Sequence, residues 1–449
     1  MKQNPSQPLL TVLFVQKALS ESQHPDLPHA PITFVTTDSR QVQKGCLFVA
    51  IKGESFDGHD FITQAIEKGA IAVICKKGTA PKNSQALCFE VSDTLEAYRT
   101  LAAAWRKLFK IPVIAVAGSV GKTTTKELLA TLLSQKFKKV LKTQGSQNGF
   151  VGIPMTLMEL RPEHDAAVIE IGIDEIGAME KHLDIVEPTA SIVTAIAPEH
   201  LHQLKDLPTV AREEIYALST PASQGAKVAI NADDSWIKTA TNSLRGPWIY
   251  RFTLSAPTPI KPCVSGKISG DLKTLKISYY PADEKPLLEF QCPLPLPGEH
   301  HARNLLGAIA LALAEGLSPT QITTGINRFK PAPGRTEIKE LSSGATFICD
   351  HYNASPASMK AAIELLNSLS AQKQKNTFLC LGDMLELGDD EEKFHREISA
   401  SIARLKAPHV YLYGKRMKWL QDELKKSGDK ITIEHFDSHE KIAEALKKN

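Results

Sequence analysis

Short apolar runs alternate with amphipathic segments from the beginning of the chain. Apolar runs at residues 47–51 and 71–75 are each followed by a segment, at 61–68 and 95–108, whose apolar residues recur every three or four positions. The first pattern is typical of a buried strand, and the second is typical of a helix packed on a core. Residues 1–108 are therefore predicted to form a small α/β domain.

A second block, residues 109–331, carries apolar runs that are rich in β-branched residues. It opens with a run at residues 111–117, and a helical pattern at 303–315 closes it. Further apolar runs lie at residues 166–172, 191–197 and 226–231. Strands that are buried on both faces have this pattern, so the block is predicted to be a parallel sheet covered by helices. Between residues 246 and 297, many prolines and alternating patterns predict an antiparallel insertion.

The third block follows residues 330–334, whose two prolines and one glycine are typical of a linker. Its apolar runs lie at residues 346–349, 377–381, 409–413 and 431–436. They alternate with helical patterns at residues 358–369, 391–405, 417–426 and 439–447. This alternation predicts a Rossmann-like, open α/β domain over residues 332–449. The whole chain is thus predicted to be an α/β protein of three domains.

Composition and charge narrow the possible functions. Of the 449 residues, 53 are Lys or Arg and 50 are Asp or Glu, so the net charge is only +3 and gives no reason to expect nucleic acid or a membrane surface as a partner. The seven cysteines form no Cys-x-x-Cys pair, which predicts reduced thiols in a cytoplasmic protein. No apolar stretch approaches the roughly 20 residues that span a bilayer, so we expect no membrane insertion. We also expect a monomer.

A glycine-rich segment directly after the run at 111–117 carries the first chemical signal. Its residues are Gly118, Ser119, Val120, Gly121, Lys122, Thr123 and Thr124, and a helical pattern follows. A turn of this kind between a strand and a helix binds phosphate through backbone N–H groups and the positive end of the helix. Lys122 is expected to reach the outer phosphates, and Thr123 to place its hydroxyl on Mg²⁺. Val116 stands where the first glycine of the longer common motif would be, and an incidental glycine-rich turn is the alternative.

Further polar residues follow the other apolar runs of the central block. Glu170 ends one run, and His200 lies just past the next. Loops beyond the carboxyl ends of parallel strands converge on one ligand site, so both side chains are predicted to approach a metal beside the phosphates. A carboxylate suits Mg²⁺, whereas imidazole is a less usual ligand for it. Asn231, Asp233 and Asp234 follow a fourth run, and they are either part of the same site or a polar turn.

Longer motifs, in this order along nearly the whole chain, resemble the Mur ligases of peptidoglycan synthesis. They lie at residues 38–40, 45–48, 57–61, 118–124, 231–234 and 298–301. The most specific are residues 350–359 (DHYNASPASM) and 381–388 (LGDMLELG), followed by His395. These two motifs are similar to the branch of the family that adds D-alanyl-D-alanine.

The resemblance implies an ATP-dependent, ADP-forming amide ligase that acts through an acyl phosphate. Its substrates would be UDP-N-acetylmuramoyl-tripeptide and D-alanyl-D-alanine, with ATP and Mg²⁺ required, at the last cytoplasmic step of peptidoglycan precursor synthesis. The resemblance places catalysis at Lys122, Glu170, His200 and Arg335. It implies ATP contacts from residues 118–124, from Asn304 at adenine, Arg335 at the phosphates and Asp350 at the ribose. It also implies Mg²⁺ contacts from Thr123, Glu170 and His200, UDP-muramoyl-peptide contacts from Ser39, Arg40 and Asn148, and dipeptide contacts from Tyr352, Asn353 and Asp383.

Two departures from the family pattern affect the predicted substrate and nucleotide contacts. Asn148 is followed by Gly149 and Phe150 where most relatives have asparagine and glutamate, which removes contacts from two positions. His301 stands where an asparagine usually follows the histidine.

A third departure affects the metal. Many members carry a lysine, modified to a carbamate, where this chain has Arg212. A guanidinium stays protonated and supplies no anionic oxygen to a metal. The usual second Mg²⁺ site is therefore in question, and Glu213 or Glu214 is the candidate substitute.

Three other functions remain as alternatives. A related ligase could add a different amino acid to the muramoyl-peptide, or glutamate to folate. The N-terminal motifs argue against folate as the substrate. The absence of an Asp-Asn-Pro-Arg segment argues against the relatives that add diaminopimelate or lysine. A GTPase-like switch would need an Asn-Lys-x-Asp segment, which the chain lacks. An inactive ATP-binding scaffold is conceivable because of Arg212.

Overall fold

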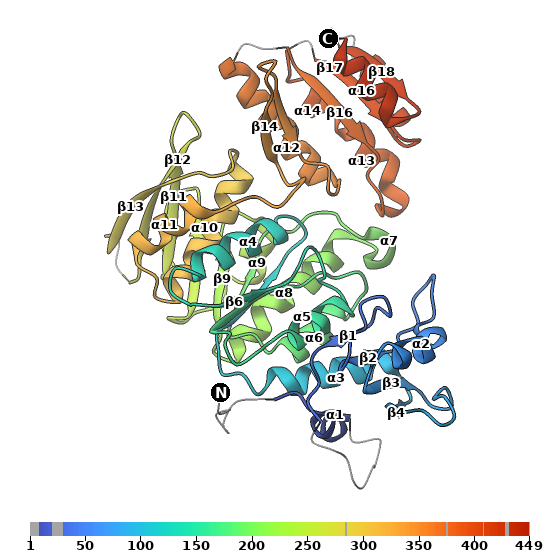
Figure 1. Cartoon of the computed structure of the whole chain (residues 1–449). Helices are drawn as coiled ribbons and strands as arrows, with labels where there is room; N and C mark the ends of the chain where they lie inside the picture. The colour runs from blue at the N-terminus through green and yellow to red at the C-terminus, as the bar shows by residue number, and fades with distance from the viewer. Residues whose placement is uncertain are drawn as a thin grey trace. The chain divides into compact units, whose positions relative to one another are not determined.

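The structure of the chain is a computed structural model that describes residues 9–19, 30–282, 285–373, 376–406, 408–426 and 431–448. Strands and helices alternate along most of the described chain (Figure 1). Its strands form sheets of four, nine, two and three strands. The α/β class predicted from the hydrophobic pattern is confirmed.

The first sheet has four parallel strands in the order β1-β2-β3-β4. Its strands are β1 (Val35–Thr36), β2 (Leu47–Val49), β3 (Ala72–Lys76) and β4 (Leu87–Val91). The helices of this stretch are α1 (Val12–Leu19), the 3₁₀ turn η1 (Gly58–Phe61), α2 (Ile62–Glu67) and α3 (Thr94–Arg106). A buried cluster that includes Phe48, Ile62, Val73 and Cys75 packs β2 and β3 against α2. The two apolar runs predicted here are therefore strands whose side chains are removed from water.

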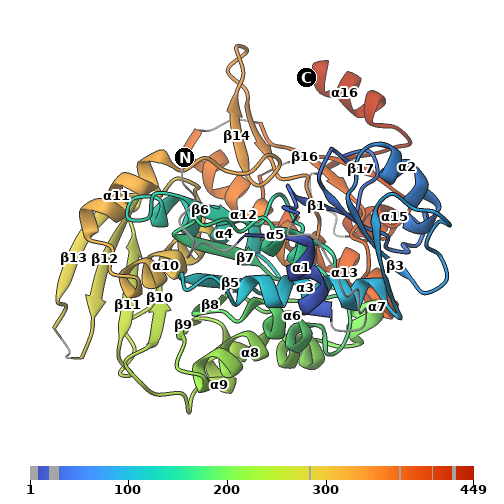
Figure 2. The same ribbon diagram turned by 60° about the horizontal axis from the view of Figure 1, so that its bottom comes forward.

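A nine-stranded sheet forms the centre of the chain, in the order β13-β12-β11-β10-β9-β8-β5-β7-β6 (Figure 2). Its strands are β5 (Val113–Ala117), β6 (Val140–Lys142), β7 (Ala166–Glu170), β8 (Ala190–Val193), β9 (Lys227–Asn231), β10 (Ile249–Thr253), β11 (Cys263–Ile268), β12 (Thr274–Tyr280) and β13 (Leu288–Pro293). The helices of this stretch are α4 (Lys122–Leu133), α5 (Gly152–Met158), α6 (Ala178–Val186), α7 (Leu201–Leu204), α8 (Leu207–Ser223), α9 (Ser235–Ala240), α10 (Glu299–Ala314) and α11 (Pro319–Arg328). Every residue of β5, β7 and β8 is buried, as the continuous apolar runs predict.

The segment predicted as an antiparallel insertion continues this sheet instead. β10 pairs in parallel with both β9 and β11. Antiparallel pairing begins only between β11 and β12 and continues to β13. The alternating pattern lies at residues 276–280, in β12, whereas β10 is buried at four of its five positions, as a strand of a helix-covered parallel sheet is. The prediction was therefore right for β12 and β13 and wrong for β10.

The C-terminal sheet has three parallel strands in the order β16-β17-β18. They are β16 (Phe378–Gly382), β17 (His409–Tyr413) and β18 (Thr432–Phe436), and the neighbouring helices are α12 (Pro356–Lys373), the 3₁₀ turn η2 (Gly388–Asp390), α13 (Glu391–Glu397), α14 (Ser399–Ile402), α15 (Met417–Lys426) and α16 (His439–Lys447). The strand predicted at 346–349 is β15 (Thr346–Cys349), but it pairs with β14 (Glu337–Glu340) in an antiparallel two-stranded sheet. The prediction that it joins the Rossmann-like sheet is therefore wrong.

By compactness the chain divides into two units, each made of several segments. One unit comprises Met1–Ala115, Lys136–Gly172 and Met179–Ala190, and the other comprises Val116–Gln135, Ile173–Ala178 and Ser191–Asn449. This division separates strands of the central sheet and does not test the predicted boundaries. The three domains at 1–108, 109–331 and 332–449 stay a prediction.

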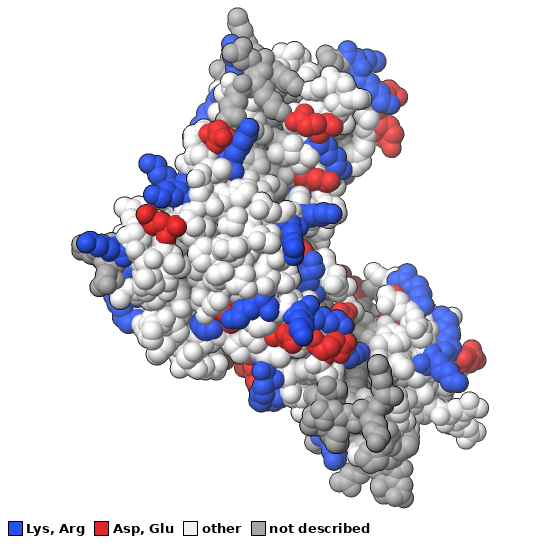
Figure 3. Space-filling model, turned by 60° about the vertical axis from the view of Figure 1, so that its left-hand side comes forward, with Lys and Arg blue, Asp and Glu red and all other residues white. Residues whose placement is uncertain are grey.

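The surface charges, the cysteine thiols and the helix lengths can be compared with the predictions from composition. Lys and Arg side chains are interspersed with Asp and Glu on the face drawn in Figure 3. All seven cysteines are free thiols. Among the residues that the structure describes, no helix is both long and apolar enough to cross a membrane.

Candidate active site

The predicted phosphate loop joins β5 to α4, and its two glycines are required by close neighbours. Gly118 has φ +120° and Gly121 has φ +88°, a region that other residues rarely adopt. A Cβ atom on Gly118 would lie 2.8 Å from the backbone nitrogen of Thr194, and one on Gly121 would lie 2.6 Å from Oδ1 of Asn304. The loop therefore depends on glycine at both positions. Asn304, the residue predicted to contact adenine, lies directly against it.

Residues just after β8 brace this loop. The Ser119 N–H donates to the carbonyl of Ala195 at 2.8 Å, and the Ala197 N–H donates to the hydroxyl of Ser119 at 3.0 Å. The hydroxyl of Thr194 donates to the carbonyl of Val120 at 2.5 Å. Thr194 was not predicted, because a threonine at the end of an apolar run has no distinctive sequence signal.

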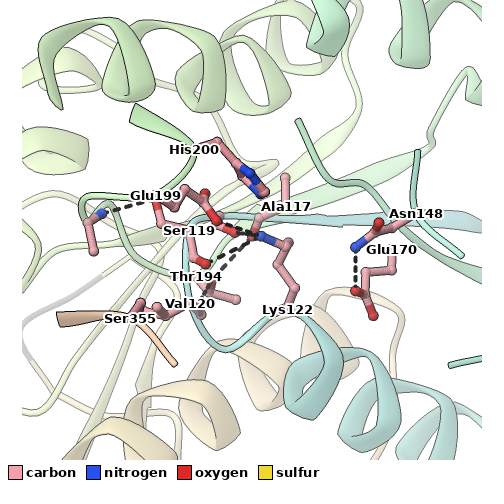
Figure 4. Close-up of polar contacts among 12 residues, drawn as sticks. Ala117, Ser119, Val120, Lys122, Asn148, Glu170, Thr194, Glu199, His200 and Ser355 are labelled. Carbon is pink, nitrogen blue, oxygen red and sulfur yellow. Dashed lines mark hydrogen bonds and ion pairs between the residues drawn. The ribbon is translucent and has the colours of Figure 1, made fainter. Parts of the chain in front are cut away.

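Lys122 begins α4 and its ammonium group turns back onto the loop. Its Nζ lies 2.6 Å from the carbonyl oxygen of Gly118 and 3.3 Å from that of Ser119. It also lies 3.3 Å from Oε2 of Glu199, which comes from the segment between β8 and α7 (Figure 4). Both side chains of this ion pair are largely buried, with 14% and 11% of their surface exposed. The lysine was predicted for this site and Glu199 was missed.

A second carboxyl group, Glu214, lies beside Glu199, and the sequence named it only as a candidate substitute at the metal. Glu214 is completely buried, and its carboxyl group interacts with Glu199 and with the backbone of Gly118. Burial raises the pKa of Glu214 above its ordinary value; Lys122 opposes the rise, and the Glu199 carboxylate adds to it. The sequence does carry a signal for it, because Glu214 shares one face of α8 with Val210 and Leu218, and both of those are buried.

Glu170, a predicted Mg²⁺ ligand, is the last residue of β7 and is only 1% exposed. Asn148 donates its side-chain N–H to Oε1 of Glu170 at 2.8 Å (Figure 4). The backbone N–H of Glu170 donates to the hydroxyl of Thr143 at 3.0 Å. The segment after β6 therefore fixes the direction of this carboxylate. Asn148 is predicted to bind the muramoyl-peptide, and one of its side-chain N–H groups is already hydrogen-bonded to Glu170.

His200, the third predicted metal ligand, precedes α7 with φ +48°. Its Nδ1 lies 2.5 Å from Oε2 of Glu386, so one ring nitrogen already has a partner. The two remaining candidates, the hydroxyl of Thr123 and the carboxylate of Glu170, are both oxygen donors.

These oxygen donors fit Mg²⁺ better than a softer metal. Mg²⁺ usually keeps several waters and takes one or two protein oxygens together with substrate phosphates. Across the described parts of the chain, no group of three or more His, Cys, Asp or Glu side chains could hold a metal by itself.

The polar residues after β9 form hydrogen bonds with neighbouring backbone segments. This favours a polar turn over a place in the phosphate and metal site. Asn231 donates its side-chain N–H to the carbonyl of Thr194 at 2.8 Å. Asp233 accepts a hydrogen bond from the Leu254 N–H at 2.7 Å. Asp234 caps the start of α9 and accepts the N–H of Ile196 at 2.9 Å.

The segment after α11 forms a second group of predicted residues. Oδ1 of Asp350 accepts hydrogen bonds from the N–H and the hydroxyl of Thr336, at 2.9 and 3.2 Å. Thr336 has φ +55°, so this carboxylate holds a left-handed turn in place. Burial raises the pKa of Asp350, and its bonds from Thr336 oppose the rise. The guanidinium of Arg335 lies 4.0 Å from the ring centre of Tyr352, which is exposed.

The other residues predicted for the dipeptide lie near the C-terminal sheet. Oδ1 of Asp383 accepts the N–H groups of Arg416 and Met417, each at 3.0 Å, at the start of α15. His395 accepts the N–H of Met384 at 3.0 Å. Asn353 is exposed. These contacts give Asp383 a structural role that its sequence motif does not reveal.

The residues predicted for the UDP-sugar lie beside β1. Arg40 is exposed and donates to both carboxylate oxygens of Asp38, and these bonds lower the pKa of Asp38 to about 2. Ser39 is buried, and its carbonyl accepts a hydrogen bond from Lys68 at 2.9 Å. In the nearby motif at 57–61, Nε2 of His59 accepts the Lys76 N–H at 3.1 Å.

The structure also places the residues that depart from the family pattern. Arg212 lies on the exposed side of α8, where it donates to the hydroxyl of Thr209 at 3.2 Å. Glu213 accepts the N–H of Gly177 at 3.0 Å, so Glu214 is the acidic residue of this segment that neighbours Lys122.

Phe150 and His301, the two aromatic residues that depart from the family pattern, each pack against another ring. The ring of Phe150 lies 4.6 Å from the ring of His182 and 5.0 Å from the guanidinium carbon of Arg99. His301 is buried against His300 at a ring distance of 3.9 Å, and burial lowers the pKa of His301 well below its ordinary value.

Family models match three segments of the chain. The model of the Mur ligase family, catalytic domain, matches residues 31–106. The model of the Mur ligase middle domain matches residues 116–312, and that of the Mur ligase, glutamate ligase domain, matches residues 334–449.

Two curated relatives are similar over most of their length. A UDP-N-acetylmuramoyl-tripeptide–D-alanyl-D-alanine ligase from Synechocystis sp. is 35% identical over 382 residues, which cover 85% of this chain and 79% of the relative. The protein of the same name from Bacillus subtilis is 31% identical over 433 residues, which cover 95% of this chain and 90% of the relative.

Two solved structures share the fold. MurF from Acinetobacter baumannii superposes with a TM-score of 0.83 at 28% identity, covering 99% of this chain and 93% of that one. MurF ligase from Thermotoga maritima, in complex with ADP, superposes with a TM-score of 0.77 at 24% identity, covering 93% and 91%. At this lower identity the second similarity supports the fold alone.

Proposed function

The chain belongs to the Mur ligase family, and we propose that it is an ATP-dependent, ADP-forming ligase that joins D-alanyl-D-alanine to UDP-N-acetylmuramoyl-tripeptide in peptidoglycan precursor synthesis. The two substrates are those in the names of its relatives. The structural observation that carries the proposal is the glycine-dependent loop between β5 and α4 with Lys122 at its end. We assign the reaction to the cytoplasm, where ATP and UDP-linked sugars are available.

The proposed reaction has two steps. Forming an amide from a carboxylate is uphill in water, so the γ-phosphoryl group of ATP is first transferred to the carboxylate of the tripeptide, which gives an acyl phosphate and ADP. The amine of D-alanyl-D-alanine then attacks the acyl carbon, loses a proton, and phosphate leaves. The first step gathers several negative charges, so catalysis comes mainly from positioning and charge neutralisation.

The chain's own residues supply most of this neutralisation. We assign Lys122 to the outer phosphates, where its ammonium would exchange the loop carbonyls and Glu199 for phosphate oxygens. Arg335, which lies in the segment after α11, is assigned to the same phosphates. Thr123 and Glu170 would hold Mg²⁺, and Asn148 keeps the Glu170 carboxylate oriented for this. When bound, the ion supplies further positive charge to the phosphate oxygens.

Substrate binding is assigned to residues outside the loop. We propose that Ser39 and Arg40 contact the uridine nucleotide, and that Tyr352 and Asn353 contact the dipeptide. Oδ1 of Asp383 is already used to start α15, so any contact of Asp383 with the dipeptide falls to Oδ2.

Phosphate release from ATP tests the proposed function. The purified protein is expected to release phosphate only when UDP-N-acetylmuramoyl-tripeptide and D-alanyl-D-alanine are both present, and mass spectrometry should find the pentapeptide product. Release that requires a single amino acid instead of the dipeptide would indicate another ligase of the family. Absence of release with every acceptor, from folded protein, would support an inactive scaffold.

Asp350→Ala is expected to weaken ADP binding in the presence of Mg²⁺ about tenfold or more, because a hydrogen bond to a charged acceptor is lost. Calorimetry with ADP measures this change. Asp350→Asn keeps an oxygen that can hold Thr336, so it separates loss of the ribose contact from collapse of the turn. Asp437→Ala, which removes an exposed carboxylate paired with Lys441, serves as the control. An unchanged dissociation constant in Asp350→Ala would count against the ribose assignment.

A further inference from the structure

Two buried carboxyl groups, Glu199 and Glu214, lie beside the lysine of the phosphate loop. Oε2 of Glu199 lies 3.3 Å from Nζ of Lys122, and the pair is largely buried. Glu214 is fully buried, and its carboxyl group interacts with the carboxylate of Glu199 and with the backbone of Gly118. The positive charge of Lys122 is therefore already opposed by a buried carboxylate in this structure.

The ion pair has a direct consequence for nucleotide binding. Phosphate oxygens that reach Lys122 must replace Glu199 as its partner, and they then lie close to a carboxylate that has lost its counter-ion. Like charges at such distances repel strongly where water is largely excluded. A diphosphate or triphosphate without a metal would meet this repulsion in full. A divalent cation bound to the phosphates would cancel it.

We propose that Glu199, backed by Glu214, is a specificity-determining residue that makes nucleotide binding at this loop depend on a divalent cation. Glu199 neutralises Lys122 while the loop is empty, and it repels phosphates that arrive without Mg²⁺. The loop thereby rejects metal-free nucleotides, including metal-free ATP, which is not competent for phosphoryl transfer. This inference rests on the proposed function, because it assumes that the loop binds a nucleotide.

The proposal predicts a measurable coupling between Mg²⁺ and ADP. The coupling factor is the dissociation constant of ADP in EDTA divided by that in saturating Mg²⁺, and it is reciprocal between the two ligands. Glu199→Gln keeps the size of the side chain and removes its charge. We expect this variant to bind metal-free ADP about tenfold more tightly than the wild type, with a much smaller change in Mg²⁺, so that the coupling factor falls about tenfold.

Two further variants sharpen the experiment. Glu315→Gln breaks another lysine–glutamate pair in which the glutamate is buried, with Lys227 at 3.0 Å, at the end of α10. It removes the same charge elsewhere and should leave the coupling factor unchanged. Glu199→Asp keeps the carboxylate and should retain most of the coupling. If Glu199→Gln does not fold, Glu199→Ala, which removes the same charge, decides the question, and it should lower the coupling factor in the same direction.

Isothermal titration calorimetry with ADP, in EDTA and in MgCl₂, distinguishes the outcomes. A lowered coupling factor in Glu199→Gln with an unchanged one in Glu315→Gln supports the proposal. An unchanged or raised coupling factor in folded Glu199→Gln overturns it, even though the wild type binds ADP. If the wild type binds ADP under neither condition, the proposed function itself fails.

Discussion

Lys122→Ala is expected to abolish ligation without unfolding the protein. The ammonium group of Lys122 lies on the phosphate loop, where it contacts two loop carbonyls and Glu199. Its removal withdraws positive charge from the position where phosphate oxygens gather in the transition state. Losing one preorganised group of this kind costs at least about a hundredfold in kcat. Phosphate release from ATP in the presence of both substrates measures the loss.

Lys122→Ala leaves the largely buried Glu199 carboxylate without its counter-ion, so the thermal midpoint of the variant should fall. Circular dichroism at the assay temperature should still report a folded protein. Lys139→Ala provides the control, since Lys139 forms an exposed pair with Glu163 at 2.9 Å and lies in the other compact unit. Near-normal turnover by folded Lys122→Ala would refute the phosphate role of the loop.

The glycine-dependent turn between β5 and α4 was predictable from sequence because its signal is local. Glycines at 118 and 121, a lysine and two threonines between a buried strand and a helix leave few other arrangements for the backbone. The neighbours that impose the glycines were not predictable in the same way. Thr194 and Asn304 reach the loop only after the sheet has brought β8 and α10 beside it.

The sequence did not place the acidic residues Glu199 and Glu214 beside Lys122. Glu199 adjoins the predicted His200, but nothing in its position indicates that it pairs with Lys122 across 77 residues. Glu214 was named only as a substitute for a modified lysine at position 212. The rotation of α8 turns Arg212 outward and Glu214 inward, and helical spacing from Val210 and Leu218 would have indicated this.

Strand direction was the weakest part of the fold prediction. The runs that became β5, β7, β8 and β9 are buried on both faces, and such runs specify a helix-covered sheet. Between residues 246 and 297 the alternating pattern belongs to β12, which is antiparallel to both of its neighbours, whereas β10 is buried at four of its five positions and lacks that pattern. The register Ile249↔Val228 that joins β10 to β9 depends on contacts between distant segments.

Glu170→Gln is expected to reduce ligation by about two to three orders of magnitude, because a charged Mg²⁺ ligand becomes neutral. The substitution is well defined structurally. Its amide oxygen can still accept the hydrogen bond that Asn148 now donates at 2.8 Å, and the backbone bond to Thr143 is unaffected. The change therefore isolates the charge of the carboxylate from its position.

The Mg²⁺ dependence of phosphate release gives the most direct measurement of this effect. In Glu170→Gln, half-maximal activity should require a higher Mg²⁺ concentration, whereas metal-free ADP should bind no more weakly than it does to the wild type. Glu163→Gln, an exposed change in the same compact unit, should leave both quantities unchanged. A Glu170→Gln protein with normal turnover and a normal Mg²⁺ requirement would remove Glu170 from the metal site.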